Sequence, residues 1–194
     1  MAITINGSTG ITSSEIADGT ITNADVNDVA ASKLTGALPA IDGSSLTGVG
    51  GANTPAFQAR RSSYFSFSDN TYTKVTGFVE TFDTDNNFTS DRFTPTTAGK
   101  YFVLVEGSLQ GVNSYDMYNG HIEIRKNGAA ISNIGSQGNV SYRSHRYGLV
   151  MQSIVDMNGT TDYLEMWVYL NNSGSAGAQV EGDSAAFSAF KLIT

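Results

Sequence analysis

The sequence predicts a mainly β protein whose short strands pack as a sandwich or jelly roll. From Pro55 onward, short runs of β-branched and aromatic residues alternate with Gly, Asn, Asp and Ser, which is typical of strands joined by turns. The 194-residue chain has 21 Gly and only 15% charged residues, a composition that favours many turns over long helices. About eight to ten such strands follow Pro55, and this number indicates a β-sandwich.

The composition argues against several function classes. The formal net charge of -7 is unfavourable for a nucleic-acid binder, because phosphate recognition needs clustered Lys and Arg. The absence of Cys excludes disulfides and Cys-ligated metals. The N-terminus lacks the regions of a signal peptide, and no apolar run approaches the roughly 20 residues of a membrane span. We expect a protein made in a cytosol, without membrane insertion, and stabilised by burial or oligomerisation.

Residues 1–51 are expected to form an extended segment that other chains help to order. All aromatic residues lie at or after Phe57, and a segment without them buries little apolar surface. Short polar repeats with one apolar residue each suit an intertwined fibre. The alternatives are a flexible polar linker and a short helix over residues 24–34, and residues 48–51 are expected to form a hinge. The apolar residues spaced five apart are Ile11, Ile16, Ile21 and Val26.

Alternation and turn signals place the strands of residues 52–194 in order. The predicted strands cover residues 56–61, 64–67, 72–79, 78–88 with a loop at 83–87, 92–110, 121–125, 149–155, 163–170 and 186–193. Asn127-Gly128 predicts a tight hairpin turn, because both residue types tolerate positive φ. In the strand over 163–170, one predicted face holds Leu164, Met166, Val168 and Leu170, and the other holds Tyr163, Glu165, Trp167 and Tyr169.

The stretch Arg92–Gln110 is expected to hold the central strand. Pro95 and Gly99 interrupt it, and residues 101–105 then run without a polar side chain. Such a run indicates a strand buried on both faces, whereas an antiparallel strand normally exposes one face to water. We therefore expect a second sheet or another copy of the chain to cover the second face.

Five motifs follow one another through residues 56–194. They are Phe57–Arg60, Gly99–Val103, Ile124–Gly128, Asp162–Met166 and Phe187–Ile193. Their order and spacing resemble the complement globular-head family, the trimeric tumour-necrosis-factor-like jelly rolls, although Ala189 stands where that family usually has Gly and no collagen repeat is present. The resemblance implies a ten-strand-type jelly-roll head that forms a homotrimer. It also implies that the Tyr101 or the Phe102 side of the central strand faces the other subunits, with a trimer interface drawn from Tyr101, Phe102, Val103 and Phe187.

Two stretches of the N-terminal segment, Thr20–Val26 and Gly36–Gly48, resemble the repeats of tailed-phage fibre proteins. This resemblance implies a virion protein assembled in the host cytoplasm. Residues 1–51 would then form a shaft or bind other virion proteins, and residues 52–194 would form the head.

Residues 141–147 are the main candidate for a receptor-binding surface. They gather two Arg, one His and two Tyr in an acidic chain, and Tyr and Arg form large, stiff contacts with hydrogen-bonding ends. Arg also suits the phosphates and carboxylates of bacterial surface glycans. The alternative is an exposed strand that meets a neighbouring subunit. The candidate residues are Tyr142, Arg143, His145, Arg146 and Tyr147, with Tyr115 and Tyr118 as a second group.

Neither a catalytic site nor a cofactor is predicted. The chain has two His and no Cys, and it lacks the common hydrolase, zinc-protease and nucleotide-binding motifs. Asp83, Asp85 and Asn87 match the first half of a calcium loop, but Phe88 stands where such a loop needs Gly. A polar turn is therefore favoured over calcium.

These observations predict a non-enzymatic homotrimeric phage fibre or tail-appendage protein whose head adheres to a bacterial cell-surface glycan or protein. The main alternative is a structural decoration, collar or baseplate protein that binds only other phage proteins. A glycan depolymerase with a carboxylate pair assembled from distant loops is a further alternative.

Overall fold

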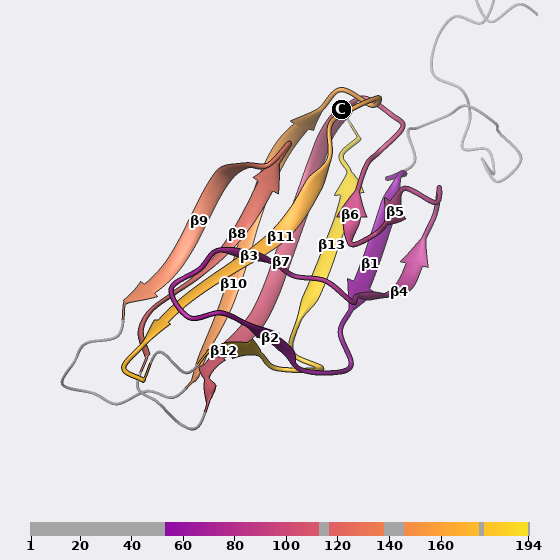
Figure 1. Cartoon of the computed structure of the whole chain (residues 1–194). Coiled ribbons are helices and arrows are strands. Elements are labelled where there is room, and N and C mark those ends of the chain that lie inside the picture. Colours follow the sequence, from indigo (N-terminus) through magenta and orange to yellow (C-terminus); the bar gives the residue numbers. More distant parts are fainter. Residues whose placement is uncertain (1–52, 113–116, 138–145, 175–176, 194) are drawn as a thin grey trace, which may run out of the picture. The chain divides into compact units, whose positions relative to one another are not determined.

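Two antiparallel sheets pack face to face in the computed structural model, which describes residues 53–112, 117–137, 146–174 and 177–193 (Figure 1). The large sheet runs in the order β2-β12-β7-β13-β1-β4, with β10 also paired to β7. Its strands are β1 (Ala56–Arg60), β2 (Phe65–Phe67), β4 (Val79–Asp83), β7 (Gly99–Gly111), β10 (Arg146–Met157), β12 (Ala178–Val180) and β13 (Ala186–Lys191).

The small sheet runs in the order β5-β6-β11-β8-β9, with β3 also paired to β11. Its strands are β3 (Thr73–Lys74), β5 (Phe88–Thr89), β6 (Arg92–Phe93), β8 (Met117–Lys126), β9 (Ala129–Gln137) and β11 (Leu164–Asn172). The two sheets form a sandwich, which confirms the predicted fold class. The predictions for residues 1–51 lie outside the described residues.

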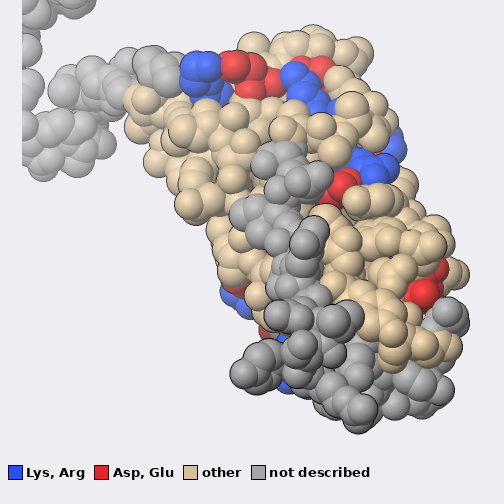
Figure 2. All heavy atoms as spheres, turned by 90° about the vertical axis from the view of Figure 1, so that its left-hand side faces the viewer, with Lys and Arg blue, Asp and Glu red and all other residues tan. Residues whose placement is uncertain are grey.

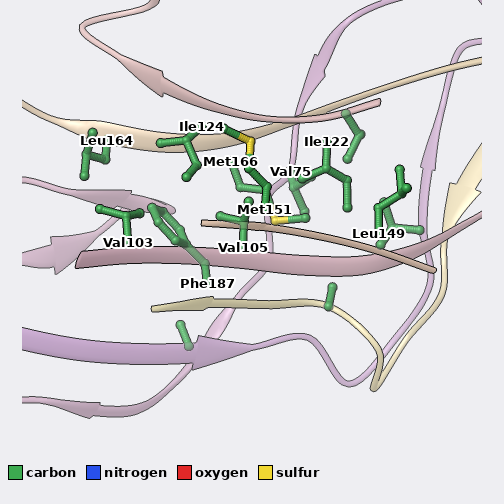
Figure 3. Close-up of a cluster of buried hydrophobic side chains, with 14 of the residues drawn as sticks. Val75, Val103, Val105, Ile122, Ile124, Leu149, Met151, Leu164, Met166 and Phe187 are labelled. Carbon is green, nitrogen blue, oxygen red and sulfur yellow. The ribbon is translucent and has the colours of Figure 1, made fainter. Parts of the chain in front are cut away.

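The core lies between the sheets, and β11 supplies one side of it. Leu164, Met166, Val168 and Leu170 are fully buried, as their alternation predicted. In Figure 3, Leu164, Met166, Ile122 and Ile124 of the small sheet lie opposite Val103, Val105, Leu149 and Met151 of the large sheet. The period-2 pattern of each strand therefore fixes which side chains enter the core.

Within a single chain, the central strand β7 is buried on one face only, so burial of its second face by another copy stays a prediction. Tyr101, Val103 and Val105 have no exposed surface, whereas Phe102 and Leu104 on the opposite face are partly exposed. The second sheet covers the Tyr101 side. The apolar run over residues 101–105 therefore gives β7 an apolar outer face as well as an apolar inner face. No part of the described chain covers that outer face.

The predicted strand over residues 72–79 is split into β3 and the start of β4. Gly77 has a φ of 79° and turns the chain, and the backbone N–H of Phe78 donates to the Asp91 carboxylate at 2.8 Å. The chain thereby leaves the small sheet after Lys74 and joins the large sheet at Val79. The hairpin prediction is confirmed, with φ angles of 53° at Asn127 and 83° at Gly128.

Candidate functional site: the two outer faces of the sandwich

The outer face of the large sheet carries adjoining apolar side chains. Phe102 of β7 pairs in register with Ile154 of β10 on one side and with Phe190 of β13 on the other. The rings of Phe102 and Phe190 lie 5.4 Å apart, and Ile154 is 61% exposed. A solvent-exposed row of this kind is unusual for a surface that only water covers. We call the following five residues the apolar face: Phe102, Leu104, Val150, Ile154 and Phe190.

The apolar face has a charged boundary at one end and a hollow at the other. Lys100 and Asp156 form an ion pair of 2.7 Å beyond Ile154. At the opposite end, a hollow of about 160 Å³ lies between β7 and β10 beside Ser184, and Gly148 and Val150 line it. A side chain at Gly148 would meet nothing within 4 Å. The hollow is therefore open to a side chain from outside this chain.

The outer face of the small sheet is different, because its charged groups form a fixed network. Glu165 of β11 accepts hydrogen bonds from Arg92 at 2.8 and 3.0 Å and pairs with Lys74 at 3.0 Å. The indole N–H of Trp167 donates to the same carboxylate at 3.1 Å. Burial by itself raises the pKa of Glu165, but these donors outweigh it and hold the pKa below its ordinary value.

Aromatic rings and Arg side chains continue this network along the sheet. The Arg125 guanidinium lies 4.1 Å from the ring centroid of Trp167 and 5.2 Å from that of Tyr72. Tyr72 and Tyr169 have centroids 4.7 Å apart, and His121 lies 5.5 Å from Tyr169. We call the following eight residues the aromatic–basic face: Tyr72, Lys74, Arg92, His121, Arg125, Tyr163, Trp167 and Tyr169.

On one side of the molecule, charged residues of both signs are mixed rather than separated. On the side drawn in Figure 2, Lys and Arg lie beside Asp and Glu in small groups, and most of the visible surface belongs to other residues. Arg125 pairs with Glu123 at 2.8 Å, which gives one instance of such a group. This side of the molecule therefore does not offer the extended basic stripe that a nucleic acid requires.

The predicted receptor-binding residues are described only in part. Tyr142, Arg143, His145 and Tyr115 lie outside the described residues. The other three lie at the start of β10 and in β8. Arg146 is exposed and pairs with Glu181 at 2.8 Å, Tyr147 packs against the core, and Tyr118 is 43% exposed. The partly buried Tyr147 is thus the least accessible of the three.

Three of the four predicted interface residues belong to the core of a single chain. Tyr101, Val103 and Phe187 are fully buried, so their side chains do not face another subunit. The Tyr101 hydroxyl donates to the Thr97 carbonyl at 2.7 Å, and burial raises its pKa to about 12. Phe102 does face outward. Of the two sides that the resemblance left open, the Phe102 side is the outer one.

The candidate calcium loop is used as a hydrogen-bonded turn. The two Asp83 carboxylate oxygens accept the backbone N–H groups of Asp85 and Phe88, at 3.3 and 2.7 Å. The side-chain amide oxygen of Asn87 accepts the backbone N–H of Thr96 at 2.6 Å. Among the described residues, no three His, Asp or Glu side chains gather as metal ligands would. The oxygens of Asp83 and Asn87 thus already have partners within the turn.

Sequence reasoning missed most residues of both outer faces. Ile154 and Phe190 were assigned to strands without an orientation, and Tyr72, Lys74, Arg92 and Arg125 were not linked. The sequence held a weak signal of the outer face of the small sheet, because alternation correctly places Glu165, Trp167 and Tyr169 on one face of β11. Identifying their neighbours requires the pairing of β11 with β3, β6 and β8.

Comparison with known proteins supports the fold alone. No family model matches the chain, and no curated protein matches it. Among solved structures, an Eiger TNF from S. frugiperda matches with a TM-score of 0.51 and 9% identity, covering 71% of this chain and 91% of its own. Murine APRIL at pH 8.0 matches with a TM-score of 0.52 and 10% identity, covering 71% of this chain and 98% of its own. The described part of the chain is thus a jelly-roll sandwich of the TNF type. Within that part, no helix is long and apolar enough to cross a membrane.

Proposed function

We propose that the chain is a homotrimeric fibre or tail-appendage protein of a phage, whose head adheres to the bacterial surface. The observation that carries the trimer is the apolar face of the large sheet. Its central row joins Phe102, Ile154 and Phe190, and the second sheet lies on the other side. Burying such a row against other copies of the chain removes apolar side chains from water, which stabilises the assembly.

The number of subunits comes from the resemblance to trimeric jelly rolls, and the TNF-type fold supports it. An interface of this obligate kind buries on the order of 2,000 Å² or more and resembles a protein core. Three heads held together raise the overall strength of weak individual contacts. The repeats of residues 1–51 support the assignment to a phage fibre, with attachment to the virion through that segment.

The trimer is tested by the mass of the full-length chain in solution. We expect a trimer for the natural sequence and a folded monomer for Ile154→Asp, because a carboxylate in an apolar interface is strongly unfavourable. Ile131→Asp is the matched control, since it places the same carboxylate at an exposed isoleucine of β9 in the small sheet, outside the apolar face. Analytical ultracentrifugation measures the mass of each species, and circular dichroism shows whether the variant is folded. A well-folded monomer of the natural sequence at micromolar concentration would refute the trimer.

Adhesion is tested on virions that carry residues 1–51 without the head. Assembled particles that no longer adsorb to host cells support adhesion. Particles that fail to assemble support the alternative role as a structural virion component. Release of sugar products from purified host polysaccharide by the full-length protein would instead indicate an enzyme.

A further inference from the structure

The aromatic–basic face of the small sheet has the properties of a ligand-binding surface. Its side chains are held in place by one another, as shown by the Arg125 guanidinium stacked on Trp167 at 4.1 Å and bonded to Glu123 at 2.8 Å. A preorganised surface loses little conformational entropy when it binds. The large sheet carries the apolar face, so in the proposed trimer the small sheet is the one that faces outward.

The face also holds two polar atoms that lack hydrogen-bond partners among the described residues. They are Asn119 Oδ1 and His121 Nδ1, and both are buried. The two residues lie two apart on β8, so their side chains project from the same side of the sheet. Buried polar atoms are normally paired, and an unpaired one carries a free-energy cost. Because neither atom is accessible at the surface, a ligand would reach them only if the Asn119 and His121 side chains rotated.

The exposed charge of this face is positive although the chain is acidic. The side chains of Glu165 and Glu123 are only 5% and 4% exposed. Arg92, Lys74 and Arg125 are more accessible, at 42%, 23% and 18%. Three cations thus oppose two buried carboxylates, which leaves one excess positive charge. A ligand that places one negative charge on this face would balance the excess positive charge.

The nature of the side chains favours a sugar over a protein partner. The centre of a protein interface is usually apolar, and Val79, Val150 and Ile154 are exposed on the large sheet, whereas Ile131 at edge strand β9 is exposed on the small sheet. Rings, guanidinium groups and amides provide flat contacts and hydrogen bonds, which match the C–H patches and hydroxyl groups of pyranose rings. A guanidinium group also binds a carboxylate in a fixed planar geometry.

From these observations we infer that the aromatic–basic face, centred on Arg125 and Tyr72, binds a uronic-acid-containing glycan. This inference rests on the proposed adhesive function and names the site and the ligand class for it. Arg125 would contact the carboxylate, and the exposed ring of Tyr72 beside it would contact the sugar ring.

The test is calorimetric titration of the full-length protein with a panel of uronate oligosaccharides. We expect saturable binding to at least one of them, and about tenfold weaker binding by Arg125→Gln, because one charge-assisted hydrogen bond is lost. The carboxyl-reduced form of the same oligosaccharide should bind about tenfold more weakly to the natural protein. Lys100→Gln is the matched control, because it removes one positive charge from the large sheet and should bind normally.

Four results would overturn the inference: no binding to any uronate, equal loss in Arg125→Gln and Lys100→Gln, equal binding of the carboxyl-reduced sugar, or tighter binding of poly(glycerol phosphate). A protein receptor would be indicated if Arg125→Gln lost adsorption to host cells while the natural protein bound no uronate. That result would support the adhesive function and contradict the proposed glycan ligand. Failure of the natural protein to adsorb to host cells, despite uronate binding, would count against adhesion alone.

Discussion

Glu165 shows how one buried carboxylate organises the outer face of the small sheet. Its two oxygens pair with Arg92 and Lys74 and accept a hydrogen bond from the Trp167 indole N–H, and its side chain is only 5% exposed. A carboxylate in such a position is costly without its donors and stabilising with them. The positions of two cations and one indole ring on this face therefore depend on a single residue.

Replacing Glu165 by Gln should lower the free energy of unfolding by about 1–3 kcal/mol, because buried donors lose an ionised acceptor. The folded-state pKa of Glu165 is depressed, so its contribution is present above the unfolded pKa and is lost as pH falls through the folded pKa. Urea unfolding at neutral and acidic pH should therefore show a smaller acid-dependent loss of stability in the variant.

The control for that measurement is Asp156→Asn. The Asp156 carboxylate is 76% exposed, and within the described ranges it pairs with the half-exposed Lys100, so the variant should change stability by less than about 1 kcal/mol. Equal effects of the two substitutions would contradict the central role of Glu165.

At the scale of elements, turns with positive φ set the pairing of the strands. Gly159, between β10 and β11, has a φ of 71°, and its Cα lies close to the loop that precedes β7. A Cβ at this position would lie 2.3 Å from the backbone nitrogen of Ala98. Gly128, in the β8–β9 hairpin, has a φ of 83° but a hypothetical Cβ there would meet only the Tyr163 hydroxyl, at 3.9 Å.

These two glycines separate backbone strain from steric clash. Gly128→Ala should lower the free energy of unfolding by about 1 kcal/mol, because only the strain of a positive φ at Ala is added. Gly159→Ala should cost about 3 kcal/mol, since backbone atoms must also move. Thermal and chemical unfolding of the two variants measures the difference, and similar losses would show that the turn after β10 does not pack closely against the loop before β7.

For the whole molecule, the two outer faces divide the proposed roles. One face is apolar and is suited to other copies of the chain, whereas the other is aromatic and basic and is suited to a polar ligand. A sandwich in which both faces were apolar would be prone to uncontrolled association. In the proposed trimer, the jelly roll would thus separate assembly from recognition by placing them on opposite sheets.

The hollow beside Gly148 provides a test of assembly that spares the fold. Gly148→Trp places a large ring where nothing lies within 4 Å of the new Cβ, so the single chain should still fold. If another copy covers the hollow, the ring obstructs contact and the mass should fall from trimer to monomer. Gly148→Ala should remain trimeric. A trimer of Gly148→Trp with unchanged melting temperature would exclude the hollow from the interface.

The sequence by itself determined the features that depend on neighbouring residues. The alternation in β11, the Asn127-Gly128 hairpin and the sandwich class follow from a period of two and from local turn geometry. Short or irregular strands such as β3 and β12 were lost or merged, because two or three residues carry too little pattern.

Only the tertiary structure decided which face of each strand is covered and which side chains meet. Alternation gives Tyr101 and Phe102 opposite faces, but the second sheet, which comes from other parts of the chain, selects the Tyr101 side for the core. Arg92 and Glu165 likewise meet only because β6 and β11 are neighbours, across 73 positions of sequence. The physical reason is that burial and ion pairing depend on long-range strand registers, which no local pattern encodes.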